Sequence, residues 1–150
     1  MRTPIAYPVA DLVPHAGAMC LLHRVIEGDA DSLVAEVDIG EGLFAGEGGV
    51  GGWVGIEYMA QAAAAWAGWQ ARLRGAEPRV GFLLGTRRYD CSRPSFLPGE
   101  TLRVEVRREF QADGGVGLVA CRIDIAGETV ATATLTVFEP EDVGAFLRPR

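Results

Sequence analysis

Lysine is absent from the 150 residues, and histidine and cysteine are scarce. All 14 basic residues are arginines, and 20 acidic residues outnumber them, which leaves a formal net charge of -6. Proteins that bind nucleic acid in general need a basic surface to displace counterions from phosphates, so this charge balance argues against that class. A hydrophobic fraction of 49% argues against intrinsic disorder, because disordered chains have too little apolar surface to bury.

The cysteines are too few and too scattered to form a metal or redox motif. Cys20, Cys91 and Cys121 include no Cys-x-x-Cys pair, which leaves a zinc ribbon or a thioredoxin-type site without support. We interpret them as reduced, small apolar residues and expect no metal site. The segment MRTPIAYPVADLVPH has prolines and an aspartate where a signal peptide needs an apolar run, so we expect a cytoplasmic protein.

The longest apolar run, WVGIEYMAQAAAAWAGW, extends from Trp53 to Trp69 and has Glu57 and Gln61 as its polar interruptions. A transmembrane helix needs about 20 apolar residues, so this run is too short to span a membrane. A soluble helix that is apolar on all sides is a buried one. The run therefore predicts a central helix over about residues 52–74, with Gly75 at a left-handed C-terminal cap.

Six other segments are expected to form strands: 19–27, 32–39, 80–89, 101–111, 116–125 and 128–137. A short helical turn is expected over residues 8–12 and a glycine-rich loop over 40–52, and glycine turns make the second half an antiparallel meander. Two strands, one helix and four strands predict a single α+β domain over residues 1–150, with the sheet wrapped around the helix. A small sheet leaves part of such a helix uncovered, so we also expect a dimer.

Glu57 and Gln61 lie one helical turn apart and therefore share a face of the predicted helix. Desolvation of a carboxyl among Trp53, Tyr58 and Met59 is expected to raise its pKa, which suits a proton donor near neutrality. The alternative is a structural glutamate that interacts with the dipole at the helix start. We expect Gln61 to orient Glu57 rather than to react.

The glycines before the helix leave the backbone N–H groups of Gly52 and Trp53 uncovered at the expected helix start. Such donors can bind a carbonyl oxygen that gains charge during a reaction. A plain flexible connection would have the same glycines.

Two histidines, His15 and His23, are the candidates for an imidazole base. His15 lies in a PHAGAM loop between a proline and small residues, which is compatible with a pocket. His23 lies within a strand-like run, where it would face solvent or pack. A structural role is open for both, and His15 is the better candidate.

Six arginines between Arg72 and Arg93 are opposed by two acidic residues, for a local net charge of +4. A basic segment on an acidic protein suits an acidic macromolecular partner. Arg87, Arg88 and Arg93 are the candidate contacts. A helix end followed by the solvent-facing side of a strand would produce the same pattern without any partner.

Three segments in succession resemble the hotdog-fold 3-hydroxyacyl-acyl-carrier-protein dehydratases. VPHAGAMCLLHRVIE is similar to their PHRxPxLLxDR element, GGWVGIEYMAQAAAAWAGW to their PGVLxxEALAQxxG helix, and GFLLGTRRYDCSRPSFLPGETLRVEV to a strand pair with an RPxxPGD-type turn. The segments keep the family's order and spacing and span about residues 9–137. The resemblance is strongest to the branch found with aryl-polyene biosynthesis genes.

This resemblance implies a hotdog homodimer or heterodimer that dehydrates 3-hydroxyacyl thioesters to trans-2-enoyl thioesters. The substrate arrives on the phosphopantetheine of an acyl carrier protein, so no resident cofactor is implied. In the family a histidine removes the C2 proton and a helix carboxyl, matched here by Glu57, protonates the departing C3 hydroxyl. A backbone N–H matched by Gly52 polarises the thioester carbonyl.

The sequence departs from the family at the base. The family's catalytic histidine lies fourteen residues before the glutamate, where Leu43 stands here, and His23 replaces the usual strand aspartate. We expect His15 to act as the base. The alternatives are a base from another subunit, or a protein that does not dehydrate.

Two other functions stay open. A hotdog thioesterase would use Glu57 to activate water or to form a covalent adduct. A non-catalytic partner subunit, or a protein that binds the acyl carrier protein, would pair with an active hotdog protein and would not need its own histidine.

Overall fold

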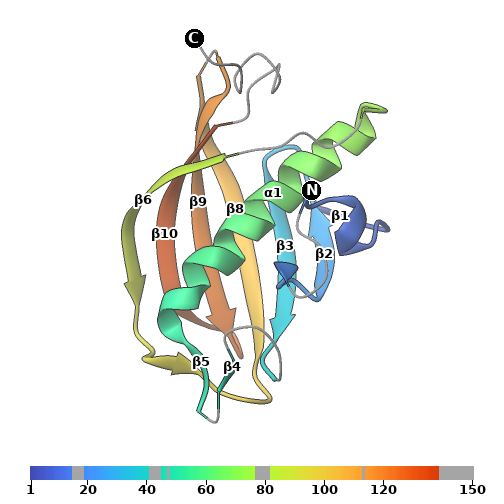
Figure 1. Cartoon of the computed structure of the whole chain (residues 1–150). Helices are drawn as coiled ribbons and strands as arrows, with labels where there is room; N and C mark the ends of the chain where they lie inside the picture. The colour runs from blue at the N-terminus through green and yellow to red at the C-terminus, as the bar shows by residue number, and fades with distance from the viewer. Residues whose placement is uncertain (15–18, 41–44, 47, 77–81, 113, 139–150) are drawn as a thin grey trace.

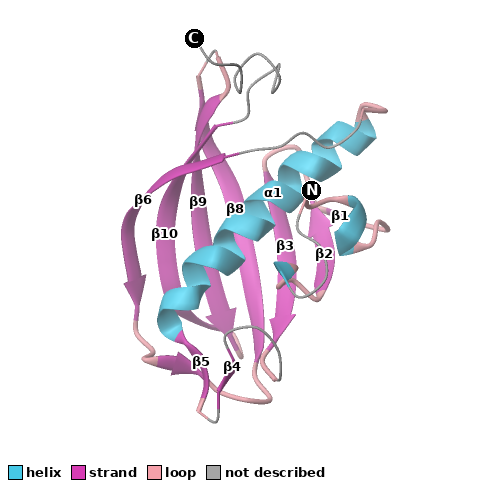
Figure 2. Cartoon of the chain, in the orientation of Figure 1, coloured by secondary structure: helices cyan, strands magenta, loops and turns pink. Residues whose placement is uncertain are grey.

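One long helix crosses one face of a curved antiparallel sheet in the computed structural model (Figure 1). The structure describes residues 1–14, 19–40, 45–46, 48–76, 82–112 and 114–138. Figure 2 shows that strands make up most of this part of the chain. The α+β class predicted from the sequence is confirmed, and the assignment of residues 1–150 to one domain stays a prediction.

The helix α1 extends over Gly55–Leu73 and follows directly on a 3₁₀ turn, η3, over Gly52–Val54. These limits confirm the predicted central helix, although its first three residues are more tightly wound than an α-helix. Gly75 has a φ of +73°, the left-handed conformation expected after the helix end. Within the described part of the chain, no helix has the length and apolar character needed to cross a membrane.

In the part of the chain that the structure describes, the main sheet has seven strands in the order β1-β2-β3-β8-β9-β10-β6, all antiparallel to their neighbours. Their bounds are Thr3–Pro4 (β1), Arg24–Gly28 (β2), Ser32–Asp38 (β3), Phe82–Cys91 (β6), Thr101–Gln111 (β8), Val116–Ile125 (β9) and Glu128–Phe138 (β10). The predicted four-strand meander is wrong in one respect, because β6 pairs with β10 and so forms an edge of the sheet. The first strand was predicted to start at residue 19, but β2 starts five residues later, at Arg24.

A second, small sheet lies at the start of α1 (Figure 1). It consists of β4 (Ala45–Gly46), β5 (Gly49–Gly51) and β7 (Ser95–Phe96). The sequence pattern instead predicts a loop over 40–52 and no strand at 95–96. Strands of two or three residues are too short to have a detectable alternation of apolar and polar side chains, so pairing between distant segments decides them.

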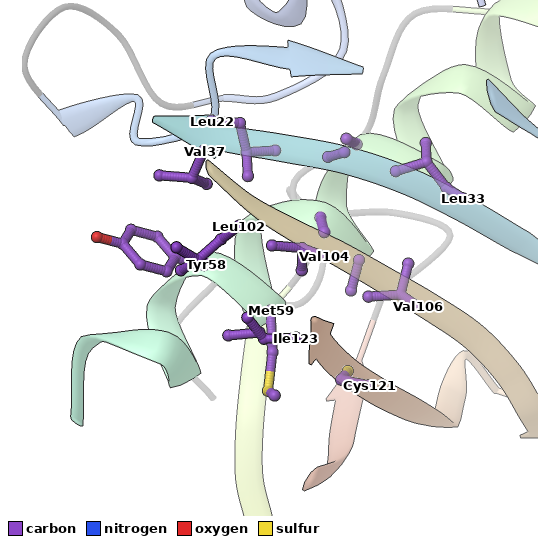
Figure 3. Close-up of a cluster of buried hydrophobic side chains, with 14 of the residues drawn as sticks. Leu22, Leu33, Val37, Tyr58, Met59, Leu102, Val104, Val106, Cys121 and Ile123 are labelled. Carbon is purple, nitrogen blue, oxygen red and sulfur yellow. The ribbon is translucent and has the colours of Figure 1, made fainter. Parts of the chain in front are cut away.

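The core fills the space between α1 and the inner face of the sheet (Figure 3). Alternate residues of β3 and β8 point inward, which confirms the pattern predicted for these two strands. The labelled inward-facing side chains of Figure 3 include Leu33, Val37, Leu102, Val104 and Val106, all 2% exposed or less. Cys121 of β9 is buried among them, and burial raises the pKa of its thiol to about 12. A thiol with this pKa behaves as an apolar core group.

The N-terminal segment is packed on α1 at a glycine. The short 3₁₀ helix η1 (Val9–Asp11) confirms the predicted helical turn, and Leu12 follows it. A Cβ at Gly68 would lie 2.0 Å from the carbonyl oxygen of Leu12, so only a glycine permits this close approach. Arg72 also donates to the Asp11 carbonyl oxygen, at 3.2 Å. The chain that leads towards His15 is therefore anchored on the helix.

Candidate active site at the start of the helix

Glu57 lies in the first turn of α1 and is half-buried. The next two side chains, Tyr58 and Met59, are buried, so the Glu57 carboxyl stands where the core meets the surface. Trp53, which the sequence analysis placed around this carboxyl, is 66% exposed. The role expected for the Trp53 N–H stays a prediction.

Gly52 is bound at both of its backbone polar groups, by Tyr89 of β6 and by Pro94 in the connection from β6 to β7. Its N–H donates to the Pro94 carbonyl oxygen at 2.9 Å, and its carbonyl oxygen accepts from the Tyr89 hydroxyl at 2.5 Å. A Cβ at Gly52 would lie 2.3 Å from the Arg93 carbonyl oxygen, so close packing requires glycine here. The expected binding of a thioester carbonyl by this N–H would require the bond to Pro94 to break.

Gln61 binds a segment that precedes the helix in the sequence, and its expected role in orienting Glu57 stays a prediction. It is 1% exposed, and its Oε1 accepts from the Leu21 N–H at 2.8 Å while its Nε2 donates to the Met19 carbonyl oxygen at 2.8 Å. Two hydrogen bonds to one extended segment satisfy a buried amide that would otherwise be costly. Gln61 therefore fixes residues 19–21 on the helix.

His15 and Leu43 lie outside the described residues. The segment that contains His15 is nevertheless docked on α1 at both of its ends, through Leu12 at Gly68 and through Met19 at Gln61. Both contacts join residues that are more than forty positions apart in the sequence. They bring the chain on either side of His15 onto the helix that carries Glu57.

His23, which precedes β2, is held by hydrogen bonds to the main chain of β3, where its N–H donates to the Glu36 carbonyl oxygen at 2.9 Å. Its Nδ1 accepts a hydrogen bond from the Asp38 N–H at 3.0 Å, and its ring is exposed. The next residue, Arg24, pairs with Glu36 and Asp38, and this pairing lowers the pKa of Asp38 to about 2. With one ring nitrogen used by the backbone, His23 has a structural role in the described structure, which leaves His15 as the candidate base.

The three arginines expected to contact an acidic partner do not share one environment. Arg87 and Arg88 lie exposed on the edge strand β6. Arg93 pairs with Glu100 at 2.6 Å, and the same carboxylate accepts from the Leu97 N–H, which stabilises the turn after β7. Arg93 is therefore part of a local structural pair, and Arg87 and Arg88 are the better candidates for contact with a partner.

Tyr89 and Cys91 of β6 also lie against the helix start, and neither was a candidate site residue from the sequence. Tyr89 is partly buried against η3, and burial, followed by its hydrogen bond with Cys91, raises the pKa of its hydroxyl above the usual range. The Cys91 thiol lies beside Gly52. The strand pattern of residues 80–89 does not indicate this contact, because it depends on a β-bulge. Among the described residues, no group of three His, Cys, Asp or Glu side chains is arranged to hold a metal ion.

Several solved structures share the fold of this chain over most of its length. The chain matches the dehydratase heterocomplex ApeI:P from Xenorhabdus doucetiae with a TM-score of 0.86 and 28% identity, covering 95% of this chain and 97% of that one. It matches a hypothetical thioesterase from Streptococcus pneumoniae, solved with coenzyme A, with a TM-score of 0.62, 13% identity and coverage of 77% and 84%. The PaaI protein of the Escherichia coli phenylacetic acid degradation operon matches with a TM-score of 0.60, 18% identity and coverage of 77% and 82%.

The matches below 25% identity show the hotdog fold alone. No curated protein sequence matches the chain significantly. The family model described as ApeP-like, ApeP dehydratase, matches residues 7–148. The predicted resemblance to the hotdog-fold dehydratases, and to their aryl-polyene branch, is confirmed. With almost its whole length matched by this model, the chain belongs to the ApeP-like dehydratase family.

Proposed function

We propose that this protein dehydrates 3-hydroxyacyl thioesters carried on an acyl carrier protein to trans-2-enoyl thioesters. One observation supports this most: Glu57 lies half-buried in the first turn of the helix on which both flanks of the His15 segment are docked. In the proposed reaction His15 takes the C2 proton, the C2–C3 double bond forms, and the C3 hydroxyl leaves as water with a proton from Glu57.

The reach of the chain is compatible with this pairing. Gln61, which binds Met19, lies one turn, or about 6 Å, along the helix from Glu57. His15 precedes Met19 by four residues, and four residues span at most about 14 Å. An imidazole and a carboxyl on opposite sides of a bound acyl chain are within that range.

A second hotdog subunit is part of the proposal. Among the described residues the strand β6 is an edge of the main sheet, and an edge strand can pair with another chain. Leu83 on this strand is 43% exposed. We propose a dimer with a second copy or with a related hotdog subunit, as in the Xenorhabdus doucetiae dehydratase heterocomplex.

A non-catalytic subunit is the second candidate, and the sequence favours it in one respect. Leu43 stands where the family has its catalytic histidine. Such a subunit would bind the carrier protein or complete the site of an active hotdog partner, and Glu57 would not transfer a proton.

Identification of the product separates these functions. The purified chain is incubated with a 3-hydroxyacyl thioester of an acyl carrier protein. We expect it to form the enoyl thioester with loss of one water, about 18 mass units. Appearance of the free acid instead would identify a thioesterase. Turnover that requires a second hotdog subunit, and that survives loss of Glu57 from this chain, would identify the non-catalytic subunit and contradict the proposal.

The two exposed arginines of β6 allow a test of the carrier. The double substitution Arg87→Gln/Arg88→Asn is expected to raise KM for the carrier-bound substrate about tenfold, because two charges that attract an acidic carrier are lost. Asn suits position 88, since Arg88 has a φ of +49° and Asn tolerates that conformation. KM for the corresponding pantetheine thioester, which has no acidic protein, should stay the same.

The matched control is Arg107→Gln, which removes an exposed charge from β8, on another part of the sheet. Equal KM changes for the control and the double variant, or for both substrates, would contradict a specific contact between β6 and the carrier. High salt should reduce the difference between the wild type and the double variant, because it screens exposed charges.

A further inference from the structure

A β-bulge interrupts the edge strand β6 close to the start of α1. In the pairing of β6 with β10, Asp90 lies opposite Thr132 and Arg87 lies opposite Thr134, so two residues of β6 face one residue of β10. Arg88, the first of the two, has a φ of +49°, a conformation that is strained for a residue other than glycine. Bulges of this kind bend a strand and redirect the side chain that follows. The redirected side chain here is Tyr89.

The Tyr89 side chain reaches the residues that begin the helix. Its hydroxyl donates to the Gly52 carbonyl oxygen at 2.5 Å, and this oxygen also accepts the Gly55 N–H in the 3₁₀ turn η3. A Cβ at Gly55 would lie 2.1 Å from the Tyr89 hydroxyl oxygen and 3.2 Å from its Cζ. The ring thus occupies the space that any larger residue at position 55 would need.

Gly52 is held at its N–H and at its carbonyl oxygen by one neighbouring segment. Tyr89 binds its carbonyl oxygen, and the Pro94 carbonyl oxygen accepts its N–H at 2.9 Å. Burial keeps the pKa of the Tyr89 hydroxyl above its usual range, so the hydroxyl stays protonated and remains a donor at physiological pH. Because η3 leads directly into α1, these contacts fix the direction in which the helix starts.

Glu57 follows Gly55 by two residues, in the same first turn of α1. A rotation or displacement of the helix start moves its carboxyl, whereas the rest of the helix is held by the core and by Gln61. We propose that Tyr89 is a positioning residue that sets the start of α1, and with it the Glu57 carboxyl, through the Gly52 carbonyl and the space at Gly55. The expected effect of Tyr89 on catalysis rests on the proposed dehydration. Its expected effect on the conformation of the helix start rests on the structure alone.

Two measurements on Tyr89→Phe in the full-length protein test the two parts separately. Amide hydrogen exchange should be about fivefold faster in the peptide that covers residues 49–58, because one hydrogen bond is lost, and unchanged in peptides from β8 and β9. With a 3-hydroxyacyl thioester, kcat should fall about tenfold while KM changes less than twofold, since a displaced acid slows the chemical step. Gly55→Ala, which displaces the Tyr89 ring, should have the same pattern in both measurements.

Tyr7→Phe is the control, because it makes the same chemical change at an exposed tyrosine of the N-terminal segment. It should leave exchange at residues 49–58 and kcat at the wild-type values. Wild-type exchange in Tyr89→Phe, or faster exchange throughout the protein, would overturn the positioning role. Local faster exchange with an unchanged kcat would overturn its catalytic part. A wild-type protein that forms no enoyl product would refute the proposed function, and the exchange data would still decide whether Tyr89 sets the helix start.

Discussion

Glu57→Gln is expected to lower the rate of enoyl thioester formation by about 10²- to 10⁴-fold, the usual contribution of a general acid. Glutamine has nearly the same size and shape, but its amide cannot supply the proton that the departing C3 hydroxyl needs. The fold should survive, because Glu57 is only half-buried and its helix is held by the core. Turnover with a carrier-bound 3-hydroxyacyl thioester and the circular dichroism spectrum are the two measurements.

Glu109→Gln is a suitable control, since it makes the same chemical change at an exposed position on β8. It should have wild-type turnover. Glu57→Asp keeps the acid but shortens the side chain, so we expect a rate between those of the wild type and Glu57→Gln. Wild-type turnover in Glu57→Gln would exclude the carboxyl from proton transfer and would leave it the helix-start role that the sequence also allows.

His15→Ala is expected to reduce turnover by a similar factor of about 10²- to 10⁴-fold, because removal of the C2 proton would lose its base. The control is His23→Ala, which removes the other histidine. His23 accepts a hydrogen bond from the Asp38 N–H, so its loss should lower stability by about 1 kcal/mol and leave turnover intact. Thermal unfolding and turnover, measured on both variants, separate the two roles.

The double variant His15→Ala/Glu57→Gln tests whether the two groups act in one step. Residues that act as a unit have strongly non-additive effects, so the double variant should be about as slow as either single variant. Full activity of His15→Ala would remove His15 from the mechanism. If that variant were inactive alone and regained turnover with a second hotdog subunit, the base would come from the partner.

Segments with a strong repeating pattern were predicted to within a residue or two. The bounds expected for the strands at 101–111 and 116–125 agree with β8 and β9, and the helix agrees apart from its 3₁₀ start. Alternation in a strand and a long apolar run in a helix are properties of the local sequence. Burial of one face then follows, as Leu102, Val104 and Val106 illustrate.

The partners of the site residues could not be predicted in the same way. Gln61 was expected to contact Glu57 because both lie on one helix face, yet a segment forty residues earlier binds its amide. Gly52 was expected to offer a free N–H, and Pro94, far along the chain, accepts it. Each of these contacts depends on which distant segment packs against the helix, and a local pattern does not contain that information.

The sequence by itself determined the acidic, lysine-free composition, the buried central helix with Glu57 and Gln61, the main strands and the resemblance to the hotdog dehydratases. The tertiary structure decided that β6 forms a sheet edge, that Gln61 anchors residues 19–21, and that Tyr89 reaches Gly52 through a bulge. The physical reason is the range of the interactions. Periodicity and propensity act over a few neighbouring residues, whereas hydrogen bonds and close contacts at the helix start join segments that meet only when the chain has folded.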